Sequence, residues 1–240
     1  MVAISAHEPS ARAIVSAIQE GDVLDLERLL EEHSTLAGAT IVDAGGSQRS
    51  LLHIATDYPG NFPNGPQTVR SLIRAGADVN ARFVGPHEET PLHWAASTDD
   101  VAVVDALIEQ GADLEAPGSV IDGTTALANA AAFGQWRAAR RLLEHGAQTN
   151  LWQAAALGLT DRVEQVLEAG ASPEELTNAL WCACHGGQRT AAHMLLEHGA
   201  DRDWVGHDGL TPLDAAERSE ATELAAWLRD SGAASARAKS

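Results

Sequence analysis

One short phrase recurs along the chain: two apolar residues, usually including leucine, then two further residues, then Gly-Ala and a polar residue. Five copies are clear, at residues 72–78, 107–113, 142–148, 166–172 and 195–201. Their glycines, together with that of a weaker copy at Gly232, lie 24 to 35 residues apart. Self-similarity at this spacing is typical of repeat proteins, in which each unit buries its apolar face only against its neighbours. The chain is therefore predicted to fold as a stacked array.

A second phrase predicts where the helices of each unit begin. Versions of it occur at residues 50–55, 90–96, 125–131 and 211–216. In the best version Thr90 is suited to cap a helix, and Pro91 to occupy its first position, where a missing N–H does no harm. A second helix is expected over 101–110, and Gly111 is suited to end it because glycine readily adopts left-handed backbone geometry. Each unit is thus predicted to contain two helices.

The phrases Thr-Pro-Leu-His and Gly-Ala-Asp resemble the ankyrin repeat, and the resemblance covers about residues 11–233. The abundance of alanine is more similar to bacterial ankyrin proteins than to animal scaffolds. The resemblance implies an all-α solenoid of about seven antiparallel helix pairs with short hairpin fingers. We expect one domain over 11–233, an N-terminal segment at 1–10 and a disordered tail at 234–240. Within the domain we expect a capping pair at 11–36 and repeats at about 50–80, 90–115, 125–149, 150–172, 177–203 and 211–233.

Departures from the regular pattern are concentrated in the connections. Residues 57–66 hold three prolines and two glycines and cannot continue a helix, so an enlarged loop is expected there. The fingers that follow Asp78 and Asp113 are longer than the family's pattern, whereas the finger between Gly146 and Gly170 is almost absent. Residues 40–49 are expected only to link the capping pair to the first full repeat.

The composition limits the class of partner. The chain has 34 acidic and 16 basic residues, which gives a net charge of −18 with neutral histidines. Such a surface repels nucleic-acid phosphates and anionic membranes and attracts a basic protein. No apolar stretch is long enough to span a membrane, and residues 1–10 lack the charged and apolar regions of a signal peptide. We therefore expect a cytoplasmic monomer that binds another protein, with basic proteins among the candidates.

Residue types that often carry chemistry have structural explanations here. The resemblance implies that His53 and His93 bridge backbone groups between adjacent turns. Cys182 and Cys184 stand two residues apart on an expected helix, so their side chains diverge and do not supply converging zinc ligands. The adjacent carboxylates Glu88 and Glu89 fall in an expected turn, where such pairs are usually solvated or favour a helix N-terminus. No phosphate-binding glycine loop or spaced Ser/His/Asp set is present, so we expect no catalytic residue, metal site, cofactor or enzyme activity.

The class of function that remains is recognition of another molecule by the protein surface. The resemblance implies that the fingers and the exposed side of the inner helices form a concave binding surface. Apolar side chains at such positions are unexpected unless a partner covers them. The candidates for partner contact are Tyr58, Phe83, Val84, Ile121, Phe133, Leu157, Trp204 and Val205. Phe83 and Trp204 are the leading candidates for anchors; the alternatives are that these two rings fold back on neighbouring fingers and that Tyr58 only pins the proline-rich loop.

The sequence thus favours a protein–protein interaction module that binds through its concave surface and fingers. Two alternatives from other classes stay open. An acidic inhibitor or immunity-type protein would block a basic enzyme and associate with it in a salt-sensitive manner. An enzyme with a site at the 57–66 loop would carry a small molecule or metal, although no constellation of residues supports one.

Overall fold

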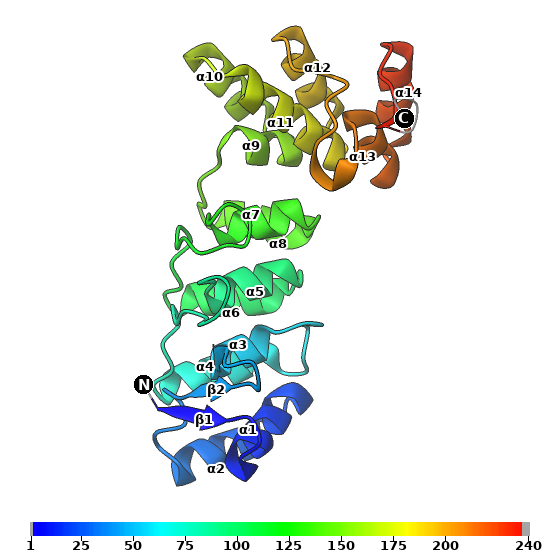
Figure 1. The fold of residues 1–240 in the computed structure, drawn as a ribbon. Coiled ribbons are helices and arrows are strands. Elements are labelled where there is room, and N and C mark those ends of the chain that lie inside the picture. Colours follow the sequence, from blue (N-terminus) through cyan, green and yellow to red (C-terminus); the bar gives the residue numbers. More distant parts are fainter. Residues whose placement is uncertain (1, 237–240) are drawn as a thin grey trace. The chain divides into compact units, whose positions relative to one another are not determined.

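The computed structural model describes residues 2–236. The chain divides into two compact units, Met1–Ala147 and Gln148–Ser240, and each is described here by itself. Both units consist mainly of antiparallel helix pairs, as the solenoid prediction requires (Figure 1).

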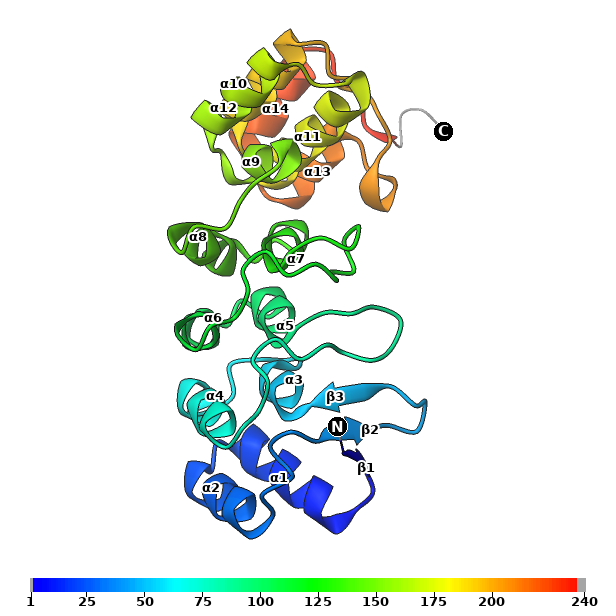
Figure 2. The ribbon, with the colours of Figure 1, turned by 90° about the vertical axis from the view of Figure 1, so that its left-hand side faces the viewer.

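In the first unit the helices form two layers, and the fingers extend from the inner layer (Figure 2). The inner helices are α1 (Pro9–Glu20), α3 (Leu51–Thr56), α5 (Pro91–Ser97) and α7 (Ala126–Ala132). The outer helices are α2 (Val23–Glu32), α4 (Gly65–Arg74), α6 (Val101–Glu109) and α8 (Trp136–Glu144). Inner helices pack on inner helices and outer on outer. Alanines such as Ala95 and Ala130 are fully buried between the inner helices, where a small side chain permits close approach.

Several of these helices begin at a residue whose side chain caps the first turn. The Ser50 hydroxyl accepts a hydrogen bond from the His53 amide at the start of α3, and Asp100 accepts one from the Val103 amide at the start of α6. Thr90 and His93 form a reciprocal capping box around the first turn of α5. Local sequence therefore accounts for where α3, α5 and α6 begin.

A small sheet, which the sequence analysis did not anticipate, lies on the side of the first unit from which the fingers extend (Figure 2). Strand β2 (Thr40–Val42) pairs in parallel with β1 (Ala3–Ser5) and antiparallel with β3 (Gln48–Ser50). Ile41, at its centre, is buried. Three-residue strands are too short to give a periodic signal, and β1 meets its partner only after α1 and α2 have folded back. Residues 2–10 and 40–49 are therefore structured parts of the unit.

The second unit contains three further helix pairs. They are α9 (Leu151–Leu157) with α10 (Thr160–Ala169), α11 (Pro173–His185) with α12 (Arg189–Glu197), and α13 (Pro212–Arg218) with α14 (Thr222–Asp230). A 3-10 turn, η1 (His207–Gly209), lies in the finger before α13. Helix α11 begins before the predicted repeat boundary at 177, because Ser172 and Glu175 form a capping box directly after Gly170.

Residues 234–236 belong to the tail for which the sequence predicts disorder, and in the structure they form hydrogen bonds to the second unit. The Ala234 amide donates to the Asp203 carboxylate, and the Ala236 amide donates to the Asp214 carboxylate, each over 2.8 Å. Two acidic side chains of the second unit thus hold residues 234–236 in place. The rest of the predicted tail, 237–240, lies outside the described residues.

Candidate protein-binding surface

The predicted binding residues divide between the two units. Five lie in the first unit: Tyr58, Phe83, Val84, Ile121 and Phe133. Three lie in the second: Leu157, Trp204 and Val205. Tyr58 is 86% exposed, and Val84, Phe133 and Val205 are each about half exposed. Ile121, Leu157 and Trp204 are partly covered.

Phe83 is not the solvent-facing side chain that the sequence suggested. It is 8% exposed, and its ring stacks on His87 at a centroid distance of 4.6 Å and lies 5.4 Å from Trp94. Its backbone amide donates to the carbonyl of Glu89. The finger folds back over the ring, which is the alternative weighed above, and the neighbouring residue Val84 is exposed instead.

Trp204 is likewise held by its own finger. Its ring lies over Gly206, where a Cβ would approach the ring to 2.1 Å, and meets His207 edge to face at 5.7 Å. His207 in turn contacts the buried Trp181 at 4.8 Å. The exposed apolar residue of this finger is the next one, Val205.

The enlarged loop, residues 57–66, is held in place by hydrogen bonds at two points. The Asn61 amide donates to Asp100 Oδ2 over 2.8 Å, and Asn64 Nδ2 donates to the carbonyl of Gly21 over 2.9 Å. Gly60 packs so closely on Thr98 that a Cβ would lie 2.5 Å from its side chain. The loop therefore presents Tyr58 from a fixed backbone.

Two predicted side chains of the first unit meet at one hollow. Tyr58, from the enlarged loop, and Phe133, at the end of α7, line a cavity of about 290 Å³ together with Val120 from the second finger. Trp94 and Glu89 line the same cavity. We call it the helix hollow. Val120 is about half exposed and lines this cavity, whereas its neighbour Ile121, which the sequence analysis named as a candidate, does not.

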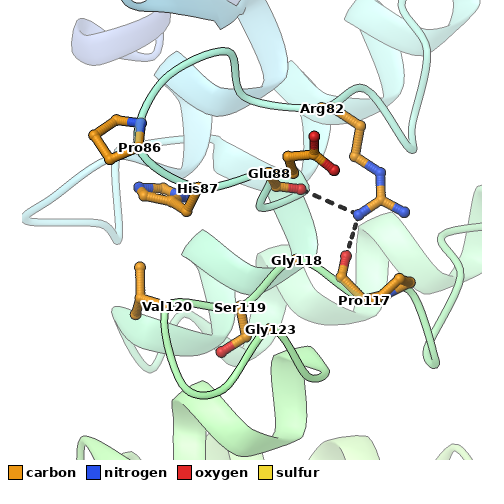
Figure 3. A pocket seen from close by; sticks show the side chains of 9 residues that line it. All are labelled: Arg82, Pro86, His87, Glu88, Pro117, Gly118, Ser119, Val120 and Gly123. Carbon is orange, nitrogen blue, oxygen red and sulfur yellow. Dashed lines mark hydrogen bonds between the residues drawn. The ribbon is translucent and has the colours of Figure 1, made fainter.

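A second cavity, which we call the finger hollow, lies between the first finger, which follows Asp78, and the second finger, which follows Asp113 (Figure 3). Its volume is about 630 Å³. The Arg82 guanidinium bridges the two fingers by donating to the carbonyls of Glu88 and Pro117. Gly118 is required at this crossing, because its φ is +122° and a Cβ would lie 2.4 Å from the Glu88 carbonyl oxygen. Val120 lines both hollows, so the two are adjacent.

A buried carboxylate joins the fingers to the inner helices. The expectation that Glu89 is solvated is wrong, since it is 5% exposed. Its carboxylate accepts hydrogen bonds from Trp94 Nε1 at 2.9 Å, Asn129 Nδ2 at 2.5 Å and the Val120 amide at 3.1 Å. His87 Nδ1 lies 3.2 Å away. The sequence analysis missed this residue because only the folded second finger covers it.

The two repeat-phrase histidines bridge backbone groups between turns, which confirms their predicted structural role. His53 Nδ1 pairs with the Ser50 hydroxyl at 2.8 Å, and Nε2 pairs with the Glu89 carbonyl at 3.0 Å. His93 accepts from the Thr90 amide at Nδ1 and reaches the Thr124 carbonyl through Nε2 at 3.2 Å. Burial lowers the pKa of His53 to about 4 and lowers that of His93 as well.

The cysteines occupy packing positions, as predicted. Both thiols are free and buried, and burial raises the pKa of Cys182 to about 12 and raises that of Cys184 as well. Within residues 2–236, no three His, Cys, Asp or Glu side chains are placed to hold a metal ion. No helix in the described part of the chain has the length and apolar character that crossing a membrane requires.

Stacked helix pairs with projecting fingers and buried bridging histidines define a solenoid repeat protein. A family model for ankyrin repeats (3 copies) matches residues 52–152 and 151–238, and the chain belongs to the ankyrin repeat family. The fold is also that of a solved structure, the human ASB11 ankyrin repeat domain. That domain aligns with a TM-score of 0.55 and 23% identity over 92% of this chain and 98% of the other.

Curated relatives are much longer proteins. The ankyrin repeat and KH domain-containing protein mask-1 of Caenorhabditis elegans is 30% identical over 171 residues, which are 71% of this chain and 6% of that protein. The human ankyrin repeat and SOCS box protein 16 is 32% identical over 173 residues, which are 69% of this chain and 32% of that protein. The similarity therefore concerns the repeat region alone.

Proposed function

We propose that this chain is a protein–protein interaction module whose partner binds across the inner helices and fingers of residues 1–147. Ankyrin repeats bind other proteins, and the family is typically non-enzymatic. The observation that carries the proposal is the convergence of exposed Tyr58 and Phe133 with Val120 around the helix hollow. Exposed aromatic side chains beside a hollow are suited to anchor a partner. The proposed setting is the cytoplasm.

The charge favours a basic partner within this proposal. A net charge of −18 speeds encounter with a positively charged protein and makes association sensitive to salt. Inhibition of a basic enzyme is the second candidate function, because the same charge would serve it. Activity of the captured partner with and without this chain separates a scaffold from an inhibitor.

The test is affinity capture from an extract of the source organism with a matched pair of variants. Replacing Tyr58 and Phe133 together by alanine is expected to weaken retention of the partner by about tenfold or more, because both rings are exposed anchors. Circular dichroism and urea unfolding should match the wild type. Retention is measured at low and moderate salt.

Leu24→Ala provides the control, since Leu24 is 81% exposed on α2, away from the helix hollow. It should retain the partner as the wild type does. Equal retention by the Tyr58/Phe133 variant and the wild type would reject this surface. Phe83→Ala is unsuitable as a probe of binding, because Phe83 is buried and its truncation leaves a cavity.

A further inference from the structure

The carboxylate of Glu89 is buried without a fixed positive charge beside it. Its hydrogen-bond donors are the neutral groups of Trp94, Asn129 and the Val120 amide. Among the described residues, the titratable side chain that forms an ion-pair contact with it is His87, at 3.2 Å. Buried carboxylates are ordinarily paired with a cation, because removal from water disfavours the charged form.

The nearby arginines, Arg49 and Arg82, form contacts with groups other than Glu89. Arg49 forms an ion pair with Asp57 at 2.6 Å, and Arg82 donates to the carbonyls of Glu88 and Pro117. Among residues 2–236, no arginine side chain forms an ion pair with Glu89. Within residues 2–236, the first unit therefore holds a buried carboxylate that no arginine side chain pairs with, and the ion-pair contact it does make is to His87.

The helix hollow gives a cation access to this charge. Glu89 and Asp57 line it, and Tyr58, Trp94 and Phe133 supply three aromatic side chains. Aromatic faces attract ammonium and guanidinium groups, and more strongly where water is excluded. The volume of about 290 Å³ lies below the usual range of about 300–1,000 Å³ for small-molecule sites. A hollow of this size suits a single side chain.

We propose that the helix hollow receives one lysine or arginine side chain of the partner, with Glu89 as its counter-charge and Tyr58 and Phe133 as its aromatic walls. This inference rests on the proposed function and names the chemistry that the surface selects. The attraction to Glu89 acts through space, because the donors of Trp94, Asn129 and Val120 already occupy its oxygens.

The proposal is tested with side-chain analogues, which need no knowledge of the partner. n-Butylammonium and n-butylguanidinium chlorides are titrated into the ¹⁵N-labelled full-length protein at constant ionic strength, with n-butanol as the neutral analogue. The reporter is the NMR signal of the Trp94 indole N–H, which donates to Glu89. We expect a saturable shift with a dissociation constant on the order of 10 mM for at least one cation and none for butanol.

Two variants locate the binding. Tyr58→Ala, at an exposed position, is expected to weaken the cation about threefold or more, and Glu89→Gln about tenfold. Glu164→Gln makes the same charge change at an exposed position in the second unit and should leave the titration unchanged. If Glu89→Gln does not fold, the comparison of Tyr58→Ala with Glu164→Gln and of cation with butanol still decides the matter.

Three outcomes overturn the proposal: no saturable shift with either cation, an equal shift with butanol, or equal weakening by Glu164→Gln and Tyr58→Ala. The second would mean an apolar hollow, and the third would mean diffuse attraction to an acidic surface. If the cations do not bind but the partner is still lost in the Tyr58/Phe133 alanine variant, this inference fails while the proposed function stands.

Discussion

Lowering the pH from about 6.5 to about 4 is expected to reduce the free energy of unfolding through His53 by about 3 kcal/mol. Burial lowers the pKa of His53 to about 4 in the folded protein, whereas an unfolded histidine titrates near its ordinary value of 6.5. Between these two values the unfolded chain binds a proton that the folded chain does not. Stability therefore falls as the pH falls, and this contribution levels off below about pH 4. Urea unfolding at a series of pH values measures it.

Replacing His53 by glutamine, which does not titrate, separates the contribution of His53 from that of the carboxylates, which also change charge near pH 4. In His53→Gln the loss of stability between pH 6.5 and 4 should shrink by about 3 kcal/mol, whatever the stability of the variant at pH 7. His33→Gln, at an exposed position, should keep the wild-type slope. Equal slopes in His53→Gln and the wild type would contradict the assignment. Burial also lowers the pKa of His93, and the contribution of that residue remains in both proteins.

Replacing Gly186 by alanine is expected to destabilise the second unit by about 3 kcal/mol. Gly186 follows the last turn of α11, and a Cβ built there would lie 1.9 Å from the carbonyl oxygen of Ala156 in α9. The conflict is with backbone, so no side-chain rotation relieves it. Helices α9 and α11 would have to separate, and they are packed closely against each other. Urea unfolding followed by circular dichroism should show a lower midpoint.

Gly38→Ala is the matched control. A Cβ at Gly38 would meet no atom within 4 Å, and its φ is not in the left-handed region, so the change should alter stability by less than about 0.5 kcal/mol. Equal unfolding midpoints for Gly186→Ala and the wild type would show that α9 and α11 do not meet as closely as described. Such a result would also remove the reason for glycine at position 186.

The candidate site was only partly predictable from the sequence. Tyr58 and Phe133 could be identified because repeat phase places them next to the inner helices, and both are exposed at one hollow. Phase does not say how a finger folds, so it could not distinguish the exposed Val84 from the buried Phe83. For the same reason the burial of Glu89 could not be predicted, because the finger that covers it lies some thirty residues further along the chain.

The sequence by itself determined the repeat architecture and where several of the helices begin, and its resemblance to the ankyrin repeat implied the structural role of the bridging histidines. These depend on local signals, such as the caps at Ser50 and Thr90, and on spacing that recurs in phase. The tertiary structure alone decided the small sheet, the burial of Phe83 and the charge enclosed at Glu89. The reason is physical: short strands and finger conformations are fixed by contacts between segments far apart in the chain, and no local periodicity records such contacts.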